Sequence, residues 1–432
     1  MRARYPDQEG FVERDGVRVF YEVFGTGEPT VFLLPAWSTV HSRFWKAQVP
    51  YLARHYRVIT FDGRGNGRSS RPLTPAAYGN EEFVADALAV LDATATERAV
   101  LVSLSMGAQW ALLLAAEHAD RVAGAAFIGP TLPISPRIEK RVVHSFDDVL
   151  DTDEGWAKYN RHYWVKDYRG FLEFFFSQCF PEPHSTKQIE DCVGWGLETT
   201  PEVLIAKEEA PSRRAINLAG GDEQHVRELA GRVCCPVLVI HGDQDAITPH
   251  ARGVKLAEMT GGRLVTLEGS GHIPLARDPV KVNLLLRELV DQARSASGSL
   301  PLSPQPGRSL AWTRGRNRQK RALYISSPIG LGHAQRDAAI AAELRKLHPD
   351  LELDWLAQHP VTRVLEERGE HIYPASEHLA NESRHIESES AEHDLHCSSP
   401  SAALSAPSRS VESVPVSGKW IVSSARGEWS AR

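Results

Sequence analysis

Short apolar runs of strand length alternate with helical patterns over the first two thirds of the chain, and this alternation restricts the fold more than any other feature. Such runs are typical of strands buried on both faces of a parallel sheet. Asp15-Gly16 between residues 11–13 and 17–23 predicts an opening hairpin. We therefore expect an α/β fold with a mostly parallel sheet covered by helices on both faces. The predicted strands are residues 30–34, 56–61, 99–104, 122–128, 236–240 and 263–267, and the predicted helices are residues 44–53, 80–93, 106–118 and 280–293.

A helical segment rich in aromatic residues interrupts this alternation between residues 133 and 232. An insertion of that length between two sheet strands predicts a lid domain. Two interpretations of its rings stay open, because they could pack only the core of the lid or also face a substrate. The aromatic residues are Trp156, Tyr159, Tyr163, Trp164, Tyr168, Phe171, Phe174, Phe175, Phe176, Phe180 and Trp195.

The composition of the sequence changes after residue 294. Residues 295–319 are rich in Ser, Pro, Gly and Arg, a composition that buries little surface and predicts a flexible linker. Residues 320–395 return to a globular pattern. Residues 396–432 are of low complexity and predict a disordered tail. We expect a first domain over residues 1–294 followed by a smaller second unit.

Composition excludes several classes of function. The 432 residues are 42% hydrophobic and 24% charged with a net charge of −6, which is typical of a soluble globular protein and not of a basic nucleic-acid binder. No apolar run reaches the ~20 residues of a membrane span, and the first residues lack the apolar core of a secretory signal. Five cysteines without paired spacing indicate reduced thiols and a cytoplasmic location. Arginine far outnumbers lysine, a coding bias that suggests a bacterial source.

One serine stands where a predicted strand runs directly into a predicted helix. On such a tight turn, the hydroxyl of Ser105 is pushed above the edge of the sheet. The residues two before and two after must be small because the strand and helix backbones nearly touch, and Ser103 and Gly107 meet this demand. A helix N-cap serine is the alternative interpretation. We expect Ser105 to be a nucleophile.

An acid and a base follow Ser105 in the expected chain order, Ser then acid then His. Asp245 comes after the strand at residues 236–240, and His272 comes after the strand at residues 263–267. His272 would take the proton of the Ser105 hydroxyl and return it to a leaving group, while Asp245 would orient the imidazole. Asp243 is expected to hold nearby backbone N–H groups. His241 and His250 are expected to be bystanders.

These segments resemble those of the α/β-hydrolase fold family, in its group of small lipase-, esterase- and lactonase-like enzymes. The resemblance covers residues 10–294. It implies a serine nucleophile and no cofactor or metal, and Ser105 disfavours the branches with an aspartate nucleophile, the epoxide hydrolases and haloalkane dehalogenases. The matching motifs are Asp62-Gly63-Arg64-Gly65-Asn66-Gly67-Arg68-Ser69, Ser103-Leu104-Ser105-Met106-Gly107, His241-Gly242-Asp243-Gln244-Asp245 and Gly269-Ser270-Gly271-His272.

The same resemblance implies an oxyanion hole made of two backbone N–H groups. One is that of Met106, and the other, by position, is that of Trp37. The family usually has His-Gly-x-Pro where this chain reads Pro35-Ala36-Trp37-Ser38, so the sequence departs from the pattern here. The glycine-rich loop 62–69 lacks the lysine of a phosphate-binding loop, and we expect a structural turn beside the site.

The second unit begins with a strand, a turn containing Gly330-Leu331-Gly332-His333, and a helix from Gln335 to about Leu347. This pattern resembles the N-terminal half of a GT-B glycosyltransferase, where such a loop lies near sugar phosphates. An ordinary strand-to-helix turn explains it as well. Residues 320–395 leave no room for the second nucleotide-binding domain of that family, which suggests a truncated or frame-shifted fusion and a partial Rossmann-like unit.

The expected function is hydrolysis of a carboxylic ester, thioester or lactone through an acyl-enzyme, with a small-molecule acyl substrate. Two alternatives remain: a bifunctional fusion that also binds a sugar nucleotide, and a hydrolase-like binding module without catalysis. The sequence does not define the acyl group, the alcohol or the oligomeric state.

Overall fold

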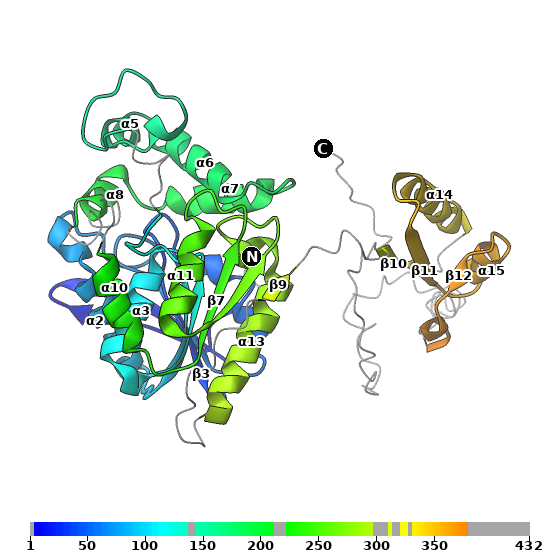
Figure 1. The fold of residues 1–432 in the computed structure, drawn as a ribbon. Helices are drawn as coiled ribbons and strands as arrows, with labels where there is room; N and C mark the ends of the chain where they lie inside the picture. The colour runs from blue at the N-terminus through cyan, green and yellow to red at the C-terminus, as the bar shows by residue number, and fades with distance from the viewer. Residues whose placement is uncertain are drawn as a thin grey trace, which may run out of the picture. The chain divides into compact units, whose positions relative to one another are not determined.

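The computed structural model describes residues 4–136, 144–210, 222–296, 310–312, 320–326 and 331–378. Contacts divide the chain into two compact units, Met1–Arg314 and Gly315–Arg432. Each unit is described by itself below, and Figure 1 shows the elements of both.

The first unit is built on a sheet that has nine strands among the described residues. Its strand order is β1-β2-β4-β3-β5-β6-β7-β8-β9. β1 pairs antiparallel with β2, and β2 pairs antiparallel with β4, whereas all the other neighbours are parallel. The expected hairpin and mostly parallel sheet are thus confirmed. The strands are β1 (Gln8–Arg14), β2 (Val17–Phe24), β3 (Thr30–Leu33), β4 (Val58–Phe61), β5 (Ala99–Leu104), β6 (Val122–Ile128), β7 (Val237–Gly242), β8 (Arg263–Leu267) and β9 (Leu310–Trp312).

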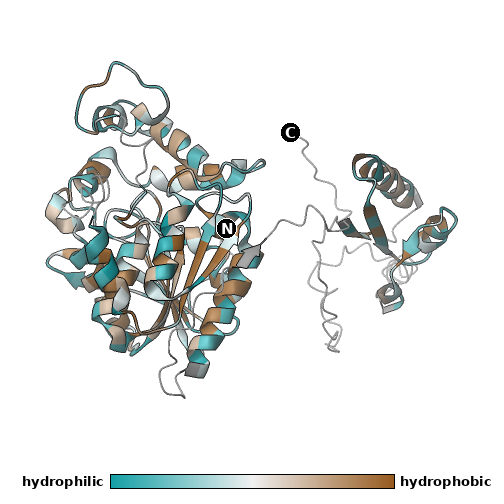
Figure 2. Cartoon of the chain, viewed as in Figure 1, coloured by the Kyte–Doolittle hydropathy of each residue, from teal (hydrophilic) through white to brown (hydrophobic). Residues whose placement is uncertain are grey.

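Apolar side chains cover both faces of this sheet, which is why most residues of its central strands are apolar. Along β3, Val31 and Leu33 join one buried cluster while Phe32 joins the other. Figure 2 shows the hydrophobic colouring of the central strands. The cluster containing Phe32 is covered by α2 (Asn80–Ala93), α3 (Gly107–Glu117), α10 (Glu223–Gly231) and α11 (His250–Thr260), and the other cluster by α1 (Val49–Leu52) and α13 (Pro279–Ala296).

A helical insertion, defined here as the residues between β6 and β7, occupies the place of the predicted lid. Figure 1 shows α5, α6 and α7 together at one end of the first unit. α10 lies within the predicted limits of the lid, but it packs on α3 and α11 and so belongs to the layer that covers the sheet. Residues 137–143 and 211–221, which belong to the predicted lid, lie outside the described residues. Before α10, the insertion contains η4 (Gly155–Lys158), α5 (Arg161–Lys166), α6 (Tyr168–Cys179), α7 (Thr186–Gly196) and α8 (Pro201–Glu208).

Two local expectations need correction. Residues 44–53, predicted as one helix, form η1 (Ser42–Trp45) and the short helix α1, which begins one residue before Pro50. The segment Leu310–Trp312, inside the predicted linker, is strand β9 and pairs in parallel with β8. Its three residues are apolar in a stretch of Ser, Pro and Arg, and they add a short edge to the sheet.

The second unit is a β-α-β-α-β segment. Its three described strands are parallel and lie in the order β10-β11-β12. Tyr324 stacks on Trp355 with ring centroids 4.5 Å apart. The predicted turn Gly330–His333 needs correction, because Leu331, Gly332 and His333 form the start of α14, four residues before the predicted helix start at Gln335. Gly330 and the predicted tail lie outside the described residues, and the glycosyltransferase resemblance stays a prediction. The elements are β10 (Lys320–Ile325), α14 (Leu331–Leu347), β11 (Leu351–Leu356), α15 (Val361–Glu366), β12 (His371–Ile372) and η5 (Pro374–His378).

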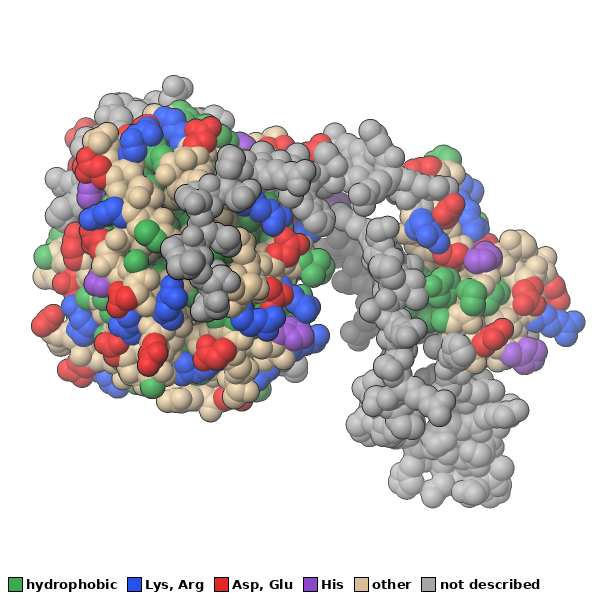
Figure 3. Space-filling view, turned by 60° about the horizontal axis from the view of Figure 1, so that its bottom comes forward, with side chains coloured by type: hydrophobic (Ala, Val, Ile, Leu, Met, Phe, Trp, Pro, Cys, Tyr) green, Lys and Arg blue, Asp and Glu red, His purple; other side chains and the backbone are tan. Residues whose placement is uncertain are grey.

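The surface of the first unit carries charges of both signs. Figure 3 shows Lys and Arg interspersed with Asp and Glu on the face turned to the viewer. Among the described helices, none is both long and apolar enough to cross a bilayer. The described cysteines Cys179, Cys192, Cys234 and Cys235 are free thiols.

The boundary between the units yields a stability prediction. A chain that ends at Arg314 keeps β9 and should unfold in urea with the same midpoint as the first unit of the full chain. A chain that ends at residue 299 loses the β8–β9 pairing and should unfold at a lower urea concentration. Circular dichroism of both shortened proteins measures the difference, and equal midpoints would show that β9 adds no stability.

Candidate active site

Ser105 lies at a strained turn between β5 and α3. Its φ angle is 54°, in the left-handed region that residues with side chains rarely adopt. The Ser105 N–H donates to the carbonyl of Ile128 at 2.9 Å, which ties the turn to the end of β6. A Cβ on Gly107 would come within 2.5 Å of the Pro35 carbonyl oxygen, so no larger residue fits there without a shift. The predicted strand–serine–helix junction is therefore present.

Asp245 and His272 come together at the ends of β7 and β8. The Asp245 Oδ2 atom lies 2.8 Å from His272 Nδ1. The other carboxylate oxygen, Oδ1, accepts the N–H groups of Ile247 and Thr248, both at 2.8 Å. Asp243 instead accepts the N–H of Gly269 at 2.6 Å, the loop-shaping contact that the sequence predicts.

The side chain of Asp245 is fully buried and is nevertheless held as a carboxylate. Burial by itself raises its pKa, but attraction to His272 and hydrogen bonds from His241 and His272 prevail and lower the pKa well below its ordinary value. A carboxylate that stays ionised accepts the Nδ1–H of His272 and leaves Nε2 of the ring as the atom that can take up a proton.

His241, expected to be a bystander, is a partner of the same carboxylate. Its Nε2 lies 3.0 Å from Asp245 Oδ2 and 3.2 Å from the carbonyl of Thr248. Its Nδ1 is buried and has no hydrogen-bond partner within the described part of the chain, so Nε2 is the nitrogen that carries the proton and donates. His241 is the next-to-last residue of β7, and its contact with Asp245 forms because the loop after β7 turns back toward the strand.

The loop after β6 contacts both Ser105 and His272. The Thr131 hydroxyl lies 3.1 Å from Ser105 Oγ and 2.7 Å from the hydroxyl of Thr248. Gly129 has a φ of 49°, and a Cβ there would lie 3.2 Å from His272 Nδ1. Thr131 was not predicted from the sequence, where its one signal is a position three residues after the end of β6.

The two expected oxyanion donors belong to adjacent segments. Met106 directly precedes α3, so its N–H lies at the helix N-terminus, where the first donors lack acceptors inside the helix. Trp37 follows Pro35, whose carbonyl lies against Gly107. The loop after β3 thus passes beside the N-terminus of α3.

The glycine-rich loop 62–69 supports the loop that carries Trp37. Asn66 Nδ2 donates to the Ser38 carbonyl at 2.7 Å, and the Ser38 hydroxyl donates to the Arg64 carbonyl at 2.8 Å. Lys207, from α8 of the helical insertion, donates to the Ser38 hydroxyl at 3.0 Å. These contacts agree with the structural turn expected from the sequence.

Aromatic rings of the helical insertion pack on Trp37. The Phe175 ring lies 5.0 Å from it, and the rings of Tyr159, Trp164 and Phe171 lie within 6.2 Å. Trp164 and Phe171 are completely buried. The rings therefore fill the core of the insertion and also cover the loop after β3. That some of them face a substrate stays a prediction.

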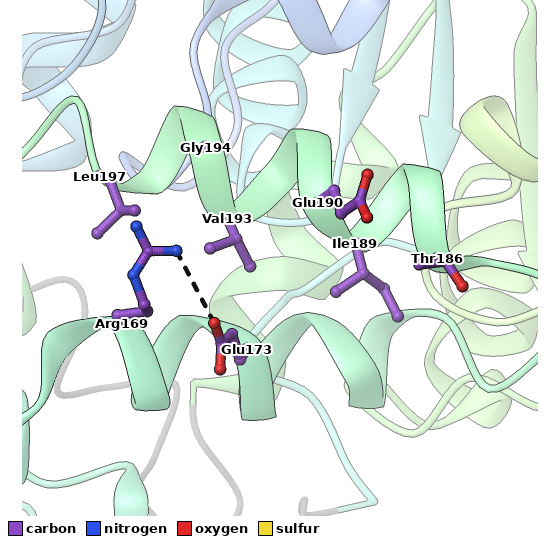
Figure 4. A pocket seen from close by; sticks show the side chains of 8 residues that line it. All are labelled: Arg169, Glu173, Thr186, Ile189, Glu190, Val193, Gly194 and Leu197. Atoms are coloured by element: carbon purple, nitrogen blue, oxygen red, sulfur yellow. Dashed lines mark ion pairs between the residues drawn. The ribbon is translucent and has the colours of Figure 1, made fainter.

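A cavity of about 320 Å³ lies between α6 and α7 (Figure 4). Arg169 and Glu173 form an ion pair across 3.8 Å at its wall. None of the residues that line it belongs to the group around Ser105, so this cavity is separate from the candidate site. Its lining residues are Arg169, Glu173, Thr186, Ile189, Glu190, Val193, Gly194 and Leu197. Among the residues that the structure describes, no cluster of three or more His, Cys, Asp or Glu side chains is arranged to hold a metal ion.

The sequence profile of the alpha/beta hydrolase fold matches residues 29–279, more than half of the chain. The chain belongs to the alpha/beta hydrolase fold family. This hydrolase is 28% identical to the 2-hydroxymuconate semialdehyde hydrolase of Pseudomonas sp. (strain CF600), over 65% of this chain and 93% of that enzyme. It is 27% identical to the non-heme chloroperoxidase CPO-A1 of Kitasatospora aureofaciens, over 60% of this chain and 90% of that protein.

A solved structure with the same fold is that of Est816, described as an N-acyl homoserine lactone degrading enzyme. It has a TM-score of 0.52 and 26% sequence identity to this hydrolase, and the match covers 65% of this chain and 99% of that one. Together these relatives identify the protein as an enzyme of the hydrolase type.

The approach of α3 to the loop after β3 yields a prediction. Gly107→Ala should lower the free energy of unfolding by about 1–3 kcal/mol, because its Cβ meets the backbone oxygen of Pro35. Gly194→Ala in α7 is the control, because no atom lies within 4 Å of its added Cβ and alanine favours a helix. Urea denaturation compares the two variants, and equal stabilities would contradict the close approach.

Proposed function

We propose that this hydrolase cleaves a carboxylic ester, thioester or lactone of a small molecule through an acyl-enzyme on Ser105. The observation that carries the proposal is the strained turn of Ser105 combined with the 2.8 Å contact between Asp245 and His272. A serine raised on such a turn, with a base held by an ionised carboxylate, is the arrangement that nucleophilic acyl transfer requires. The order Ser, Asp, His along the chain supports it.

The proposed reaction has two halves. Ser105 Oγ attacks the acyl carbon while its proton passes to His272 Nε2, and the resulting imidazolium is stabilised by Asp245. The backbone N–H groups of Met106 and Trp37 stabilise the oxyanion that forms. His272 then gives the proton to the departing alcohol, thiol or ring oxygen as the bond to the acyl carbon breaks. A water molecule repeats the attack, with His272 again as base, and releases the acid and free Ser105.

The surroundings of Trp37 favour an apolar acyl group. Its indole packs against the rings of Phe175 and Tyr159, so a substrate bound at the proposed oxyanion hole would meet aromatic surface on that side. Each methylene buried there would contribute about 0.8 kcal/mol to binding. A chain-length series of p-nitrophenyl esters from acetate to hexanoate measures the size of the acyl site.

Ser105→Ala tests the nucleophile. The variant should lose p-nitrophenyl esterase activity by on the order of 10⁴-fold or more, because the acyl-enzyme cannot form. The wild-type protein, but not the variant, should be labelled by a fluorophosphonate, and mass spectrometry should place the label on Ser105. Circular dichroism shows whether the variant keeps the fold. Unchanged turnover in a folded variant would exclude the proposed nucleophile.

Asp245→Asn and Asp243→Asn distinguish the roles of the two acidic residues in the loop after β7. Asp245→Asn should lower kcat by on the order of 10³- to 10⁴-fold, because an amide neither stabilises the imidazolium nor fixes the proton on Nδ1 of His272. Asp243→Asn should lower kcat less than tenfold, because it only weakens one hydrogen bond to Gly269. The reverse order of effects would exclude Asp245 as the acid.

A further inference from the structure

The loop that carries His272 is held by the helical insertion as well as by the sheet. This base loop comprises residues 268–273, between β8 and α12 (Pro274–Arg277). The N–H of His272 itself donates to the carbonyl of Cys179 at 3.0 Å. The neighbouring N–H of Gly271 donates to the Glu182 Oε1 atom at 2.7 Å. Both acceptors belong to the end of α6 and the turn that follows it, about ninety residues earlier in the chain.

The two segments lie in direct contact. A Cβ on Gly271 would come within 2.3 Å of Pro181 Cδ and within 2.6 Å of the Cys179 carbonyl oxygen. The glycine therefore allows the base loop to lie flat against residues 179–182, called the insertion turn below. At this separation the N–H groups of Gly271 and His272 reach their acceptors in the insertion turn.

Glu182 is a buried acid whose contacts point to a positioning role. Its side chain is only 6% exposed, and Oε1 also accepts the Ser270 hydroxyl at 3.4 Å. Its second oxygen, Oε2, has no hydrogen-bond partner within the described residues. A buried carboxylate is costly unless it is hydrogen-bonded, and bonds from backbone N–H groups to an ionised acceptor are stronger than neutral ones. Within the described residues, the donors to this carboxylate are the Ser270 hydroxyl and the Gly271 N–H, and both belong to the base loop.

Two carboxylates from different parts of the chain thus hold the base loop from two sides. Asp243, after β7, accepts the N–H of Gly269, and Glu182, from the helical insertion, accepts the N–H of Gly271. His272 follows directly, with its ring held by Asp245 and its N–H held by Cys179. The insertion turn therefore holds the backbone from which the His272 ring extends, and Asp245 holds the rotation of the ring about that backbone.

We propose that Glu182 is a positioning residue, which sets the placement of the His272 ring by accepting the N–H of Gly271. The inference rests on the proposed function, because it assigns Glu182 to the geometry of the proposed base. Through Glu182, the helical insertion would influence the proton transfer to His272 in addition to covering the site. A displacement of about 1 Å at a reacting group can cost about 10²-fold in rate, so loss of this contact should act on kcat.

Four variants of the full chain test the role of the acceptor. Glu182→Met removes it at similar side-chain length, Glu182→Asp draws the carboxylate back by one methylene, and Glu182→Gln keeps a neutral oxygen in place. Arg277→Met is the matched control, because Arg277 donates to the Pro183 carbonyl of the same region at 2.9 Å without contacting the base loop N–H groups. The readouts are kcat and KM for a p-nitrophenyl ester, the rate of fluorophosphonate labelling of Ser105, and the melting temperature.

The Met and Asp variants should lower both kcat and the labelling rate by about tenfold or more, with KM within about twofold of wild type. The Gln variant should keep both rates within about threefold of wild type, and Arg277→Met should match wild type. If Glu182→Met does not fold, the Asp and Gln variants decide the question by the same criteria.

Two results would overturn the inference. One is an unchanged kcat in the folded Met or Asp variant, and the other is a Gln variant as slow as the Met variant, which would mean that the negative charge matters rather than the hydrogen bond. Failure of the proposed function would look different, because wild-type protein would then resist the fluorophosphonate and Ser105→Ala would keep full turnover.

Discussion

The fully buried carboxylate of Asp245 is the group on which the arrangement of the site depends. A charge in this position is tolerated only if its oxygens are satisfied, and four donors supply that: two backbone N–H groups, His241 and His272. The backbone donors shape the loop after β7, and His272 brings in the loop after β8. One electrostatic requirement thus fixes the ends of two neighbouring strands relative to each other.

Much of this site could be predicted from the sequence because parallel strands end at the same edge of a sheet. Ser105, Asp245 and His272 each follow an apolar run, so their residue types and order were informative without any knowledge of packing. The central strands were also predictable, since short runs of mostly apolar residues indicate burial on both faces. The residue limits of the helices were less certain, as Pro50 and the divided helix before β4 show.

The parts that the sequence did not disclose depend on contacts between distant segments. The bond from His241 to Asp245 requires the loop after β7 to turn back on its own strand, and no local pattern encodes it. Glu182 was inconspicuous as one acid among many, and its role emerges only where α6 ends beside the base loop. Strand β9 could not be predicted, because three apolar residues in a stretch rich in Ser and Pro are too few to indicate a strand.

Strand β9 has a consequence for how the protein behaves in a concentrated solution. The exposed edge of a parallel sheet offers a row of unpaired N–H and C=O groups, to which a strand of another molecule can add. Along β8 those groups pair with Leu310–Trp312, so the chain occupies its own edge with a segment that comes after the last helix of the first unit. An edge only three residues long is a poor template for further strands, and the sheet is thereby protected against growth into aggregates from that side.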